Sequence, residues 1–313
     1  MNGRSWIVDR VGAAAFERLT TSLAGTELQS VLLEVMQRRA ARRAPKDLLA
    51  QYERDAFCAP AGVNLRASVE IDRLLLAAAP DFEAIELSPV APLGVCSAVA
   101  LTHQNRVLSA LRMTEVVSDP TNVLALECAS RLRGDPASPV YLATSQRVLR
   151  AQPVPKHAGY SQHFRIFTLV SAGLEAKDHA FTLQALELHV RTLLSALELL
   201  EQNGYAFGAP RVEVLATSER RALGERLVAA LGGRASLKSL EHPYYSSGLR
   251  YQIWVTAPDG AEVPLVDGGA FDWLGKLLSN RRAVYVATGA GAQLIALRFR
   301  AVGPPEPRAV AWA

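Results

Sequence analysis

The sequence has few cysteines, no long apolar run and no leader-like start. Its three cysteines, Cys58, Cys96 and Cys128, lie more than thirty residues apart. This spacing offers no pair of metal ligands and leaves an odd thiol for any disulfide scheme, so we expect reduced, mostly buried cysteines. No apolar run reaches the roughly twenty residues that span a bilayer, and residues 1–25 lack the basic-then-apolar order of a signal peptide. We therefore expect a cytoplasmic protein with no metal site and no membrane partner.

The common nucleotide-binding signatures are also missing. No Gly-x-Gly-x-x-Gly opens a helix after the first strand, and there is no P-loop. The formal net charge of +4 is small for 313 residues and does not by itself call for nucleic acid. Basic residues do gather locally, with no acid among them: Arg38, Arg39, Arg42, Arg43 and Lys46. On a helix over 27–43 they form either a ridge suited to phosphates or a solvated helix end, which leaves nucleic acid open as a partner.

Hydrophobic periodicity divides the chain into a helical N-terminal segment, 1–80, a core, 81–302, and a proline-rich tail, 303–313. Helices are expected over 27–43, 65–79, 103–112, 121–133, 178–203, 218–231 and 270–279, and strands over 82–87, 140–149, 164–170, 211–215 and 249–255. In the helix over 178–203, Asp178 is the expected N-cap and Gly204 the expected end. Because the strands come in pairs, we predict an α+β fold: a mixed or antiparallel sheet of about six strands flanked by helices.

The C-terminal third contains three motifs in a fixed order. Tyr244-Tyr245 precedes Asp267-Gly268-Gly269, which precedes a segment with Gly289 and Gly291. This order resembles the core of a histidyl-type class II aminoacyl-tRNA synthetase. The resemblance implies an amino-acid pocket formed by Tyr244, Tyr245, Gly268 and Gly269. It also implies that Gly289 and Gly291 contribute to one wall of an ATP site, with Mg²⁺ as the accompanying ion.

Residues 141–152 and 162–169 resemble motif 2 of that family, two antiparallel strands joined by a loop. In this resemblance Arg150 meets the α-phosphate, Gln152 replaces the glutamate that reads adenine, and Arg165 and Phe167 provide the Arg-x-Phe of the returning strand. Arg150 and Arg165 would then be the catalytic residues. The alternative is an ordinary hairpin whose arginines point to solvent.

Two further segments resemble parts of the same fold. Residues 82–89 resemble motif 1, whose strand forms the dimer interface in the family, so we expect a homodimer through residues 82–92. Thr121 stands where the family has the acid that receives the substrate ammonium. The alternative for this segment is a plain helix start, with Asp119 or Ser118 as cap and Pro120 in the first turn.

Several residues on which the chemistry depends are replaced. The arginine of motif 3 is Ala292 or Leu294, depending on the register, and Ala270 replaces the arginine of the family's Gly-Gly-Arg-Tyr-Asp. Arg298 and Arg300, on an expected strand over 297–301, could substitute only after a shift of the backbone. The family also continues into an anticodon-binding domain of about a hundred residues, where we expect only the tail here.

These observations leave three hypotheses. The favoured one is a synthetase paralog without the anticodon-binding domain, a ligand-binding or regulatory protein with degenerate ATP-site motifs, similar to the histidyl-like regulatory subunit of ATP phosphoribosyltransferase. The alternative is a remodelled enzyme that adenylates an amino acid or another carboxylate with ATP, for transfer to a non-tRNA or acceptor-stem-only target. The third is an unrelated α+β domain. The first two imply a small-molecule ligand, an amino acid or nucleotide, and leave room for a protein partner.

Overall fold

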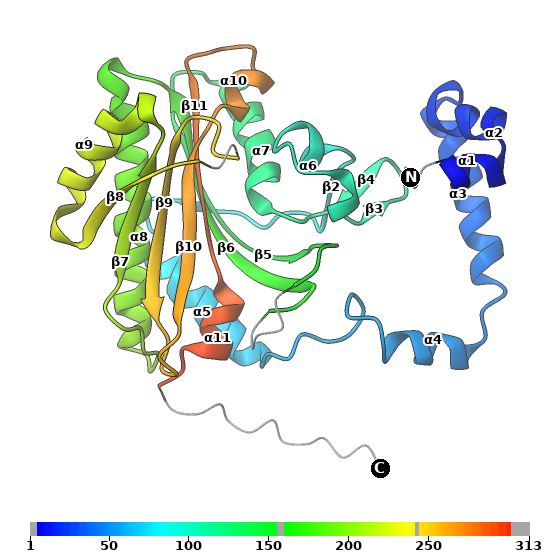
Figure 1. Cartoon of the computed structure of the whole chain (residues 1–313), viewed down its shortest axis with the longest axis horizontal. Coiled ribbons are helices and arrows are strands. Elements are labelled where there is room, and N and C mark those ends of the chain that lie inside the picture. Colours follow the sequence, from blue (N-terminus) through cyan, green and yellow to red (C-terminus); the bar gives the residue numbers. More distant parts are fainter. Residues whose placement is uncertain (1–4, 155–159, 242–243, 302–313) are drawn as a thin grey trace.

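A computed structural model describes residues 5–154, 160–241 and 244–301 of the chain. Its centre is an eight-stranded mixed sheet in the order β1-β5-β6-β11-β10-β9-β7-β8 (Figure 1). The strands are β1 (Glu83–Ala84), β5 (Val140–Leu149), β6 (His163–Leu174), β7 (Arg211–Ala216), β8 (Ala235–Ser239), β9 (Leu249–Thr256), β10 (Glu262–Phe271) and β11 (Ala283–Ala290). The two edge pairs, β1 with β5 and β7 with β8, are parallel, and the other pairs are antiparallel. The predicted mixed sheet is confirmed.

Helices cover both faces of this sheet. One face packs against α5 (Leu65–Ala77), α8 (Ala180–Glu201), α9 (Arg221–Leu231) and α11 (Ala292–Arg298). The other face packs against α7 (Pro120–Gly134) and α10 (Trp273–Leu277). Alternate side chains of a strand point to opposite faces, and β9 follows this rule along its whole length, alternating buried and half-buried residues. The face under α7 and α10 is only partly covered, and this is where the cavity described below lies.

A small three-stranded sheet stands beside the large one. It consists of β2 (Val90–Pro92), β4 (Thr114–Val116) and β3 (Ser109–Ala110), with α6 (Val95–Ala98) nearby. The buried Glu115 carboxylate accepts hydrogen bonds from the backbone N–H groups of Gly94 and Cys96, at 2.8 and 2.9 Å, and from the Gln104 amide. The helix expected over 103–112 is therefore wrong. The chain curls around this carboxylate instead, with only a 3₁₀ turn at Gln104–Arg106.

Several other element boundaries differ from the expected ones. The strand expected over 82–87 is limited to β1, while β6 continues past 170 to Leu174, and β10 occupies the start of the helix expected at 270. Asp178 does not cap α8, since it lies at φ 58° and Glu175 accepts the Thr182 N–H in its place. The strand expected over 297–301 is also wrong, because α11 continues to Arg298.

The N-terminal segment is helical, as predicted. Its helices are α1 (Ser5–Val11), α2 (Ala13–Glu17), α3 (Gly25–Ala40) and α4 (Pro45–Tyr52), with a π-helical turn at Arg18–Ser22 and then α5. α5 belongs to the core, where Ile71, Leu74 and Leu75 are buried. α3 ends at Ala40, so Arg42 and Arg43 lie beyond the helix, which favours the solvated helix end over a ridge on one helical face.

Among the helices of the described residues, none combines the length and apolar character needed to cross a membrane.

A buried polar network lies between α8 and the sheet. The imidazole of His189 contacts the Ser171 hydroxyl through Nε2 and the Thr288 hydroxyl through Nδ1, each at 2.8 Å. The Tyr251 hydroxyl is 2.7 Å from the same Thr288 oxygen. Burial lowers the pKa of His189 to about 3, because the charged imidazolium would be cut off from water. The histidine is therefore neutral in the folded protein at physiological pH.

This network predicts acid-sensitive stability. The folded-state pKa of His189 lies below its ordinary value of 6.5, so the unfolded chain binds the proton first and stability falls as the pH drops from about 6.5 towards 3. The slope from this one group approaches about 1.4 kcal/mol per pH unit. Urea unfolding at several pH values should show a shallower acid slope for His189→Gln than for wild type. His103→Gln, at an exposed histidine, should keep the wild-type slope, and equal slopes for all three would contradict the assignment.

Candidate functional site

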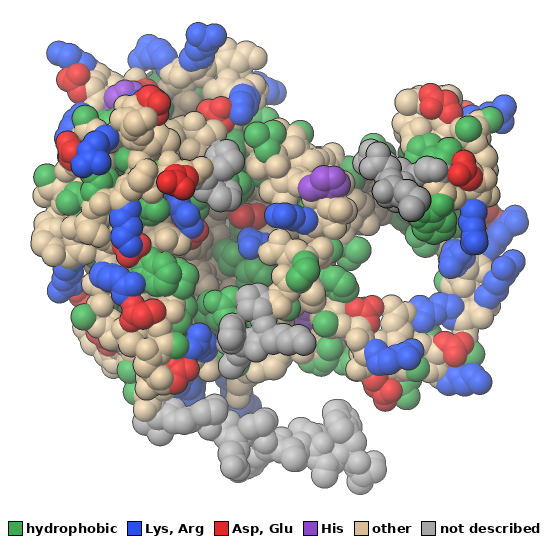
Figure 2. All heavy atoms as spheres, in the orientation of Figure 1, with side chains coloured by type: hydrophobic (Ala, Val, Ile, Leu, Met, Phe, Trp, Pro, Cys, Tyr) green, Lys and Arg blue, Asp and Glu red, His purple; other side chains and the backbone are tan. Residues whose placement is uncertain are grey.

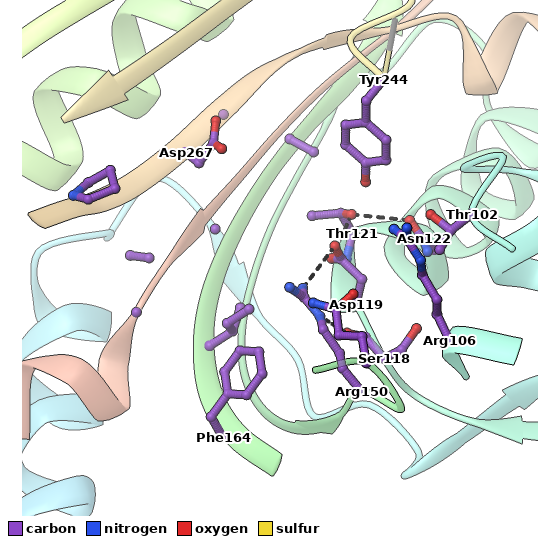
Figure 3. Close-up of a pocket in the computed structure, with 18 of the residues that line it drawn as sticks. Thr102, Arg106, Ser118, Asp119, Thr121, Asn122, Arg150, Phe164, Tyr244 and Asp267 are labelled. Carbon is purple, nitrogen blue, oxygen red and sulfur yellow. Dashed lines mark hydrogen bonds and ion pairs between the residues drawn. The ribbon is translucent and has the colours of Figure 1, made fainter. Parts of the chain in front are cut away.

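A cavity of about 590 Å³ opens on the partly covered face of the large sheet. It lies between the ends of β5 and β6, the strands β10 and β11, the start of α7 and the turn that carries Tyr244 (Figure 3). Of the residues assigned to a site from the sequence, it is lined by Thr121, Arg150, Gln152, Arg165, Tyr244, Tyr245, Gly268, Gly289 and Gly291. Residues from four distant parts of the chain thus meet at one place.

One end of the cavity is built around Arg150, which follows the last residue of β5. Its Nε donates to the Ser118 carbonyl at 2.9 Å, and its Nη2 is 3.4 Å from Oδ2 of Asp119. The guanidinium also lies over the Phe164 ring, 5.1 Å from the centroid. A guanidinium has five N–H donors, of which these contacts use two. Arg150 can therefore still bind an anionic ligand.

Asp119 holds this end to α7. Its other oxygen, Oδ1, accepts from the Thr121 N–H at 3.0 Å and the Thr121 hydroxyl at 2.8 Å, so Asp119 is the N-cap and Pro120 begins the helix. This is the helix start that the sequence offered as the alternative for the segment. Arg106 of the small-sheet region also lines the cavity, beside Thr102 and Asn122 (Figure 3). In the described part of the chain its guanidinium forms neither a hydrogen bond nor an ion pair.

The opposite end is built around Asp267 on β10. Arg250 on β9 binds this carboxylate through two contacts, Nε to Oδ1 at 2.9 Å and Nη2 to Oδ2 at 2.7 Å. The Tyr245 hydroxyl donates to Oδ1 at 2.5 Å, and Arg250 lies over the Tyr245 ring. Burial, followed by the neighbouring Asp267 charge, raises the pKa of Tyr245 far above its ordinary range. Tyr245 is therefore a neutral donor, and the charge of the Asp267 carboxylate is balanced by Arg250.

Aromatic and small polar residues line the middle of the cavity. The Tyr244 ring packs edge-on against Tyr245, Phe271 and Trp273, and its hydroxyl points towards Thr121 (Figure 3). Burial also raises the pKa of Tyr244, so this phenol is neutral as well. Burial likewise raises the pKa of Cys96, which keeps it a thiol and makes it a poor nucleophile. The middle of the cavity thus has neutral donors and flat walls.

Arg165 and Phe167 are not placed as the motif 2 resemblance implied. Arg165 pairs directly with Arg147 across the β5–β6 hairpin, so these two share the face opposite to Phe164. Its guanidinium accordingly binds Asp72 of α5 at 2.8 Å, although the residue borders the cavity. Phe167 is 1% exposed, sits in the core on the same face and does not line the cavity. Arg150 and Arg165 thus both border the cavity, but the Arg165 guanidinium is held by Asp72 on the other face of the hairpin.

The missing side chain has one structural role at Gly268 and Gly269 and another at Gly289. A Cβ at Gly268 would lie 2.3 Å from the Thr288 hydroxyl, and one at Gly269 would lie 2.4 Å from the Leu249 carbonyl and 2.5 Å from the Tyr245 ring. These two glycines make room for protein atoms, and Gly269 does not line the cavity. At Gly289 the nearest atom to an added Cβ is 3.8 Å away, on Ile166. Gly289 is thus the position where the missing side chain leaves cavity space.

The motif 3 segment provides no cation to the cavity. Gly291 precedes α11, whose first residue, Ala292, is buried in the core, and Leu294 lines the cavity. Arg298 binds Asp259 at 2.9 Å, and Arg300 lies over the Tyr205 ring. Neither lines the cavity, so neither replaces the missing arginine. The backbone shift that would let Arg298 or Arg300 substitute is not seen among the described residues.

Sequence reasoning missed several cavity residues. Phe164 and Ile166 could have been found from the hairpin register, since alternation from Arg150 places even-numbered residues of β6 on its face. Alternation along β9 could likewise have shown that Arg250 lies on the face opposite to the buried Tyr251. For Arg106 there was no signal, because its segment was expected to be a helix. The loop residues Lys156 and His157 lie outside the described residues.

The architecture is a class II synthetase-like fold, as the resemblance predicted. Similar solved structures include an ATP phosphoribosyltransferase regulatory subunit/histidyl-tRNA synthetase from Bacillus halodurans (TM-score 0.56, 13% identity), with 76% of this chain and 82% of that chain covered. A histidyl-tRNA synthetase from Nostoc gives a TM-score of 0.56 at 12% identity, covering 77% of this chain and 73% of that chain. A histidine–tRNA ligase subunit from Alicyclobacillus acidocaldarius gives 0.55 at 12%, covering 76% and 94%. Comparison of the sequence with family models and with curated proteins gave no match.

One added methyl group should destabilise the protein at Gly268 and have little effect at Gly289. Gly268→Ala should cost about 1–3 kcal/mol of stability, because Thr288 is held by Tyr251 and His189 and cannot move aside freely. Gly289→Ala should change stability by no more than about 0.5 kcal/mol. Free energies of unfolding from urea titrations of both variants test this. A large loss for Gly289→Ala would mean that its position is packed rather than open.

Proposed function

We propose that this protein is a ligand-binding protein with a class II synthetase-like fold, and that its cavity binds a small polar molecule through an anionic group. The single observation that carries the proposal is the state of Arg150. It lines the cavity, is held in place by Ser118 and Asp119, and keeps donors for a ligand. The ligand class is an amino acid or a nucleotide, as the resemblance implies.

The two ends of the cavity support different roles. At the Arg150 end, Arg106 adds a second guanidinium, and the flat Phe164 ring offers a stacking surface. At the other end, the Arg250 and Asp267 pair is neutral as a unit, with remaining lone pairs and N–H groups for polar recognition. A ligand with its anionic group at Arg150 and its polar group at Asp267 would satisfy both ends.

The residues that would contact the phosphates of a nucleotide favour binding without adenylation. During adenylate formation negative charge develops at the α-phosphate, where an arginine must meet it. In the family a further arginine binds the γ-phosphate. Here Leu294 occupies the motif 3 side of the cavity and Arg165 is bound to Asp72. Loss of one charged stabiliser of a transition state typically costs on the order of a hundredfold in rate. Two such losses support a protein that retains the pocket but not the reaction.

The fit of ATP and Mg²⁺ to these residues is incomplete. The two cavity carboxylates, Asp119 and Asp267, each lie against an arginine, and among the described residues no group of three or more His, Cys, Asp or Glu could hold a metal ion. The residues present in the described part of the chain therefore do not form a ready site for Mg²⁺. The nucleotide itself could still be bound through Arg150 and Phe164.

The second candidate is the remodelled adenylate-forming enzyme. It is favoured by one observation, the cavity-facing pair of Arg150 and Phe164, which matches the charge and flat surface that a nucleotide needs. The two candidates differ in whether pyrophosphate exchange accompanies binding.

Substitution of Arg150 tests both candidates. Calorimetry against ATP, AMP and the twenty amino acids should identify a ligand that loses about 1.5–3 kcal/mol of binding free energy in Arg150→Ala, the range for a charge-assisted hydrogen bond. Arg150→Lys should recover only part of it, since an ammonium lacks the guanidinium fork. Arg221→Ala, at an exposed arginine of α9, is the matched control and should bind as wild type.

Pyrophosphate exchange then separates the candidates. Binding with no exchange for any amino acid supports the ligand-binding protein, whereas carboxylate-dependent exchange that disappears in Arg150→Ala supports the enzyme. If wild type binds none of these molecules, or if Arg150→Ala binds as tightly as wild type, the proposed site is wrong.

A further inference from the structure

A second cavity, of about 580 Å³, lies beside α10, where β10 ends and β11 begins. We call it the α10 cavity. The starts of α8 and α9 complete its wall, and α10 marks its place at the upper end of the sheet in Figure 1. The space-filling view shows Lys and Arg side chains along this upper edge of the core (Figure 2). Among the described residues, Phe271 alone lines both this cavity and the one that contains Arg150, so the two are separate sites.

Two acidic residues line the α10 cavity, and both are already bound within the protein. Glu175 accepts hydrogen bonds from the Thr182 N–H at 3.3 Å and from the Thr182 hydroxyl, and its side chain is only 17% exposed. Asp272 accepts from the Ser246 hydroxyl at 2.6 Å and pairs with Lys276 at 2.8 Å. In the described part of the chain, neither carboxylate forms an ion pair with the two arginines that line the same cavity.

These two arginines are Arg220 and Arg281. Within the described ranges, the Arg281 guanidinium forms neither a hydrogen bond nor an ion pair, and Arg220 forms no ion pair. The Nη1 atom of Arg220 lies 3.1 Å from Nε2 of His179. A guanidinium always carries its positive charge in a protein and has five N–H donors. Two such groups on one cavity, with no acid paired to either, leave charge and donors for an anionic ligand.

His179 links Arg220 to Glu175. An arginine can only donate hydrogen bonds, so Nε2 of His179 is the acceptor. We therefore assign the ring proton to Nδ1, which lies 3.3 Å from the Glu175 carboxylate and donates to it. The imidazole is neutral in this arrangement. Glu175 thus orients the ring, and the ring orients the Arg220 guanidinium at the wall of the cavity.

The backbone beside the α10 cavity has an unfavourable conformation at two places. Asp178 and His179 both have φ of 58°, and Ser279, which also lines the cavity, has φ of 51°. Residues other than glycine adopt this left-handed conformation at a cost, and such positions cluster at ligand sites. Glycine would fit the backbone at position 179 without this cost. The imidazole retained there is the group that contacts Arg220.

We infer that the α10 cavity is a second binding site, which takes a phosphate monoester of a small molecule. A phosphate ester carries close to two negative charges at pH 7 and has three acceptor oxygens. It therefore matches two unpaired guanidiniums better than a carboxylate does, which carries one charge on two oxygens. Three buried apolar side chains also line the cavity and offer a surface for the organic part of the ester: Leu223, Leu249 and Phe271. The inference does not rest on the function proposed for the first cavity.

Calorimetry on the full chain tests this site with two probes that share a ring, phenyl phosphate and benzoate. All titrations use the Arg150→Ala protein as parent, so that the first cavity lacks its anion contact. The parent should bind phenyl phosphate, and benzoate about tenfold more weakly. Arg281→Ala and Arg220→Ala should each weaken phenyl phosphate binding about tenfold to a hundredfold, the range for a lost charge-assisted hydrogen bond. Arg221→Ala, which removes the same charge one residue along and outside the cavity, should bind as the parent does.

His179→Gly in the same parent separates binding from folding. Glycine adopts this backbone conformation freely, so the variant should unfold in urea at about the same concentration as the parent. It should bind phenyl phosphate more weakly, because Arg220 loses the ring that orients it. A loss of stability with unchanged affinity would show that the ring serves folding, which overturns its assignment to the site.

Three results would overturn the site itself. The first is a parent protein that does not bind phenyl phosphate. The second is an Arg281→Ala variant that binds it as tightly as the parent while circular dichroism shows both to be folded. The third is benzoate bound as tightly as phenyl phosphate, because the cavity would then not distinguish a phosphate from a carboxylate.

Discussion

The cavity depends on one carboxylate, Asp119. With one oxygen it caps α7 through Thr121, and with the other it lies against Arg150 at the end of β5. A helix from one layer and a strand from the other are thereby joined at the floor of the cavity. Arg150 is thereby oriented along the cavity wall, and α7 gains its N-cap. Without this carboxylate the guanidinium would keep its hydrogen bond to the Ser118 carbonyl and its contact with the Phe164 ring.

One face of the large sheet is closed and buried, and the other opens onto the cavity. The face under α8 holds a closed network in which His189, Thr288 and Tyr251 satisfy one another and Gly268 leaves room for them. With Ser171, this network links β6, β9 and β11 to α8. The opposite face of the same strands holds Arg250, Asp267 and Gly289 in the cavity. A rigid, buried face thus supports an open one, which is how a scaffold keeps binding residues in place.

A class II synthetase-like fold does not by itself imply the synthetase reaction, since function depends on the residues of the site. In this chain Leu294 lines the cavity on the side of α11, and the Arg165 guanidinium is held by Asp72 of α5. Helices α2, α3 and α4 have no buried residue and do not line the cavity.

The sequence by itself determined the order of the motifs, several of the paired strands, and the start of α7 at Ser118 or Asp119 with Pro120 in its first turn. These follow from local rules, namely alternation, capping and spacing, that a single segment carries. It did not determine which face Arg165 and Phe167 occupy, nor that Arg106 joins the cavity. Those depend on strand register and on the hydrogen bond from Gln104 to the buried Glu115. Only the tertiary structure decided them, because a shift of one residue in a strand reverses every side chain and a buried charge overrides local helix propensity.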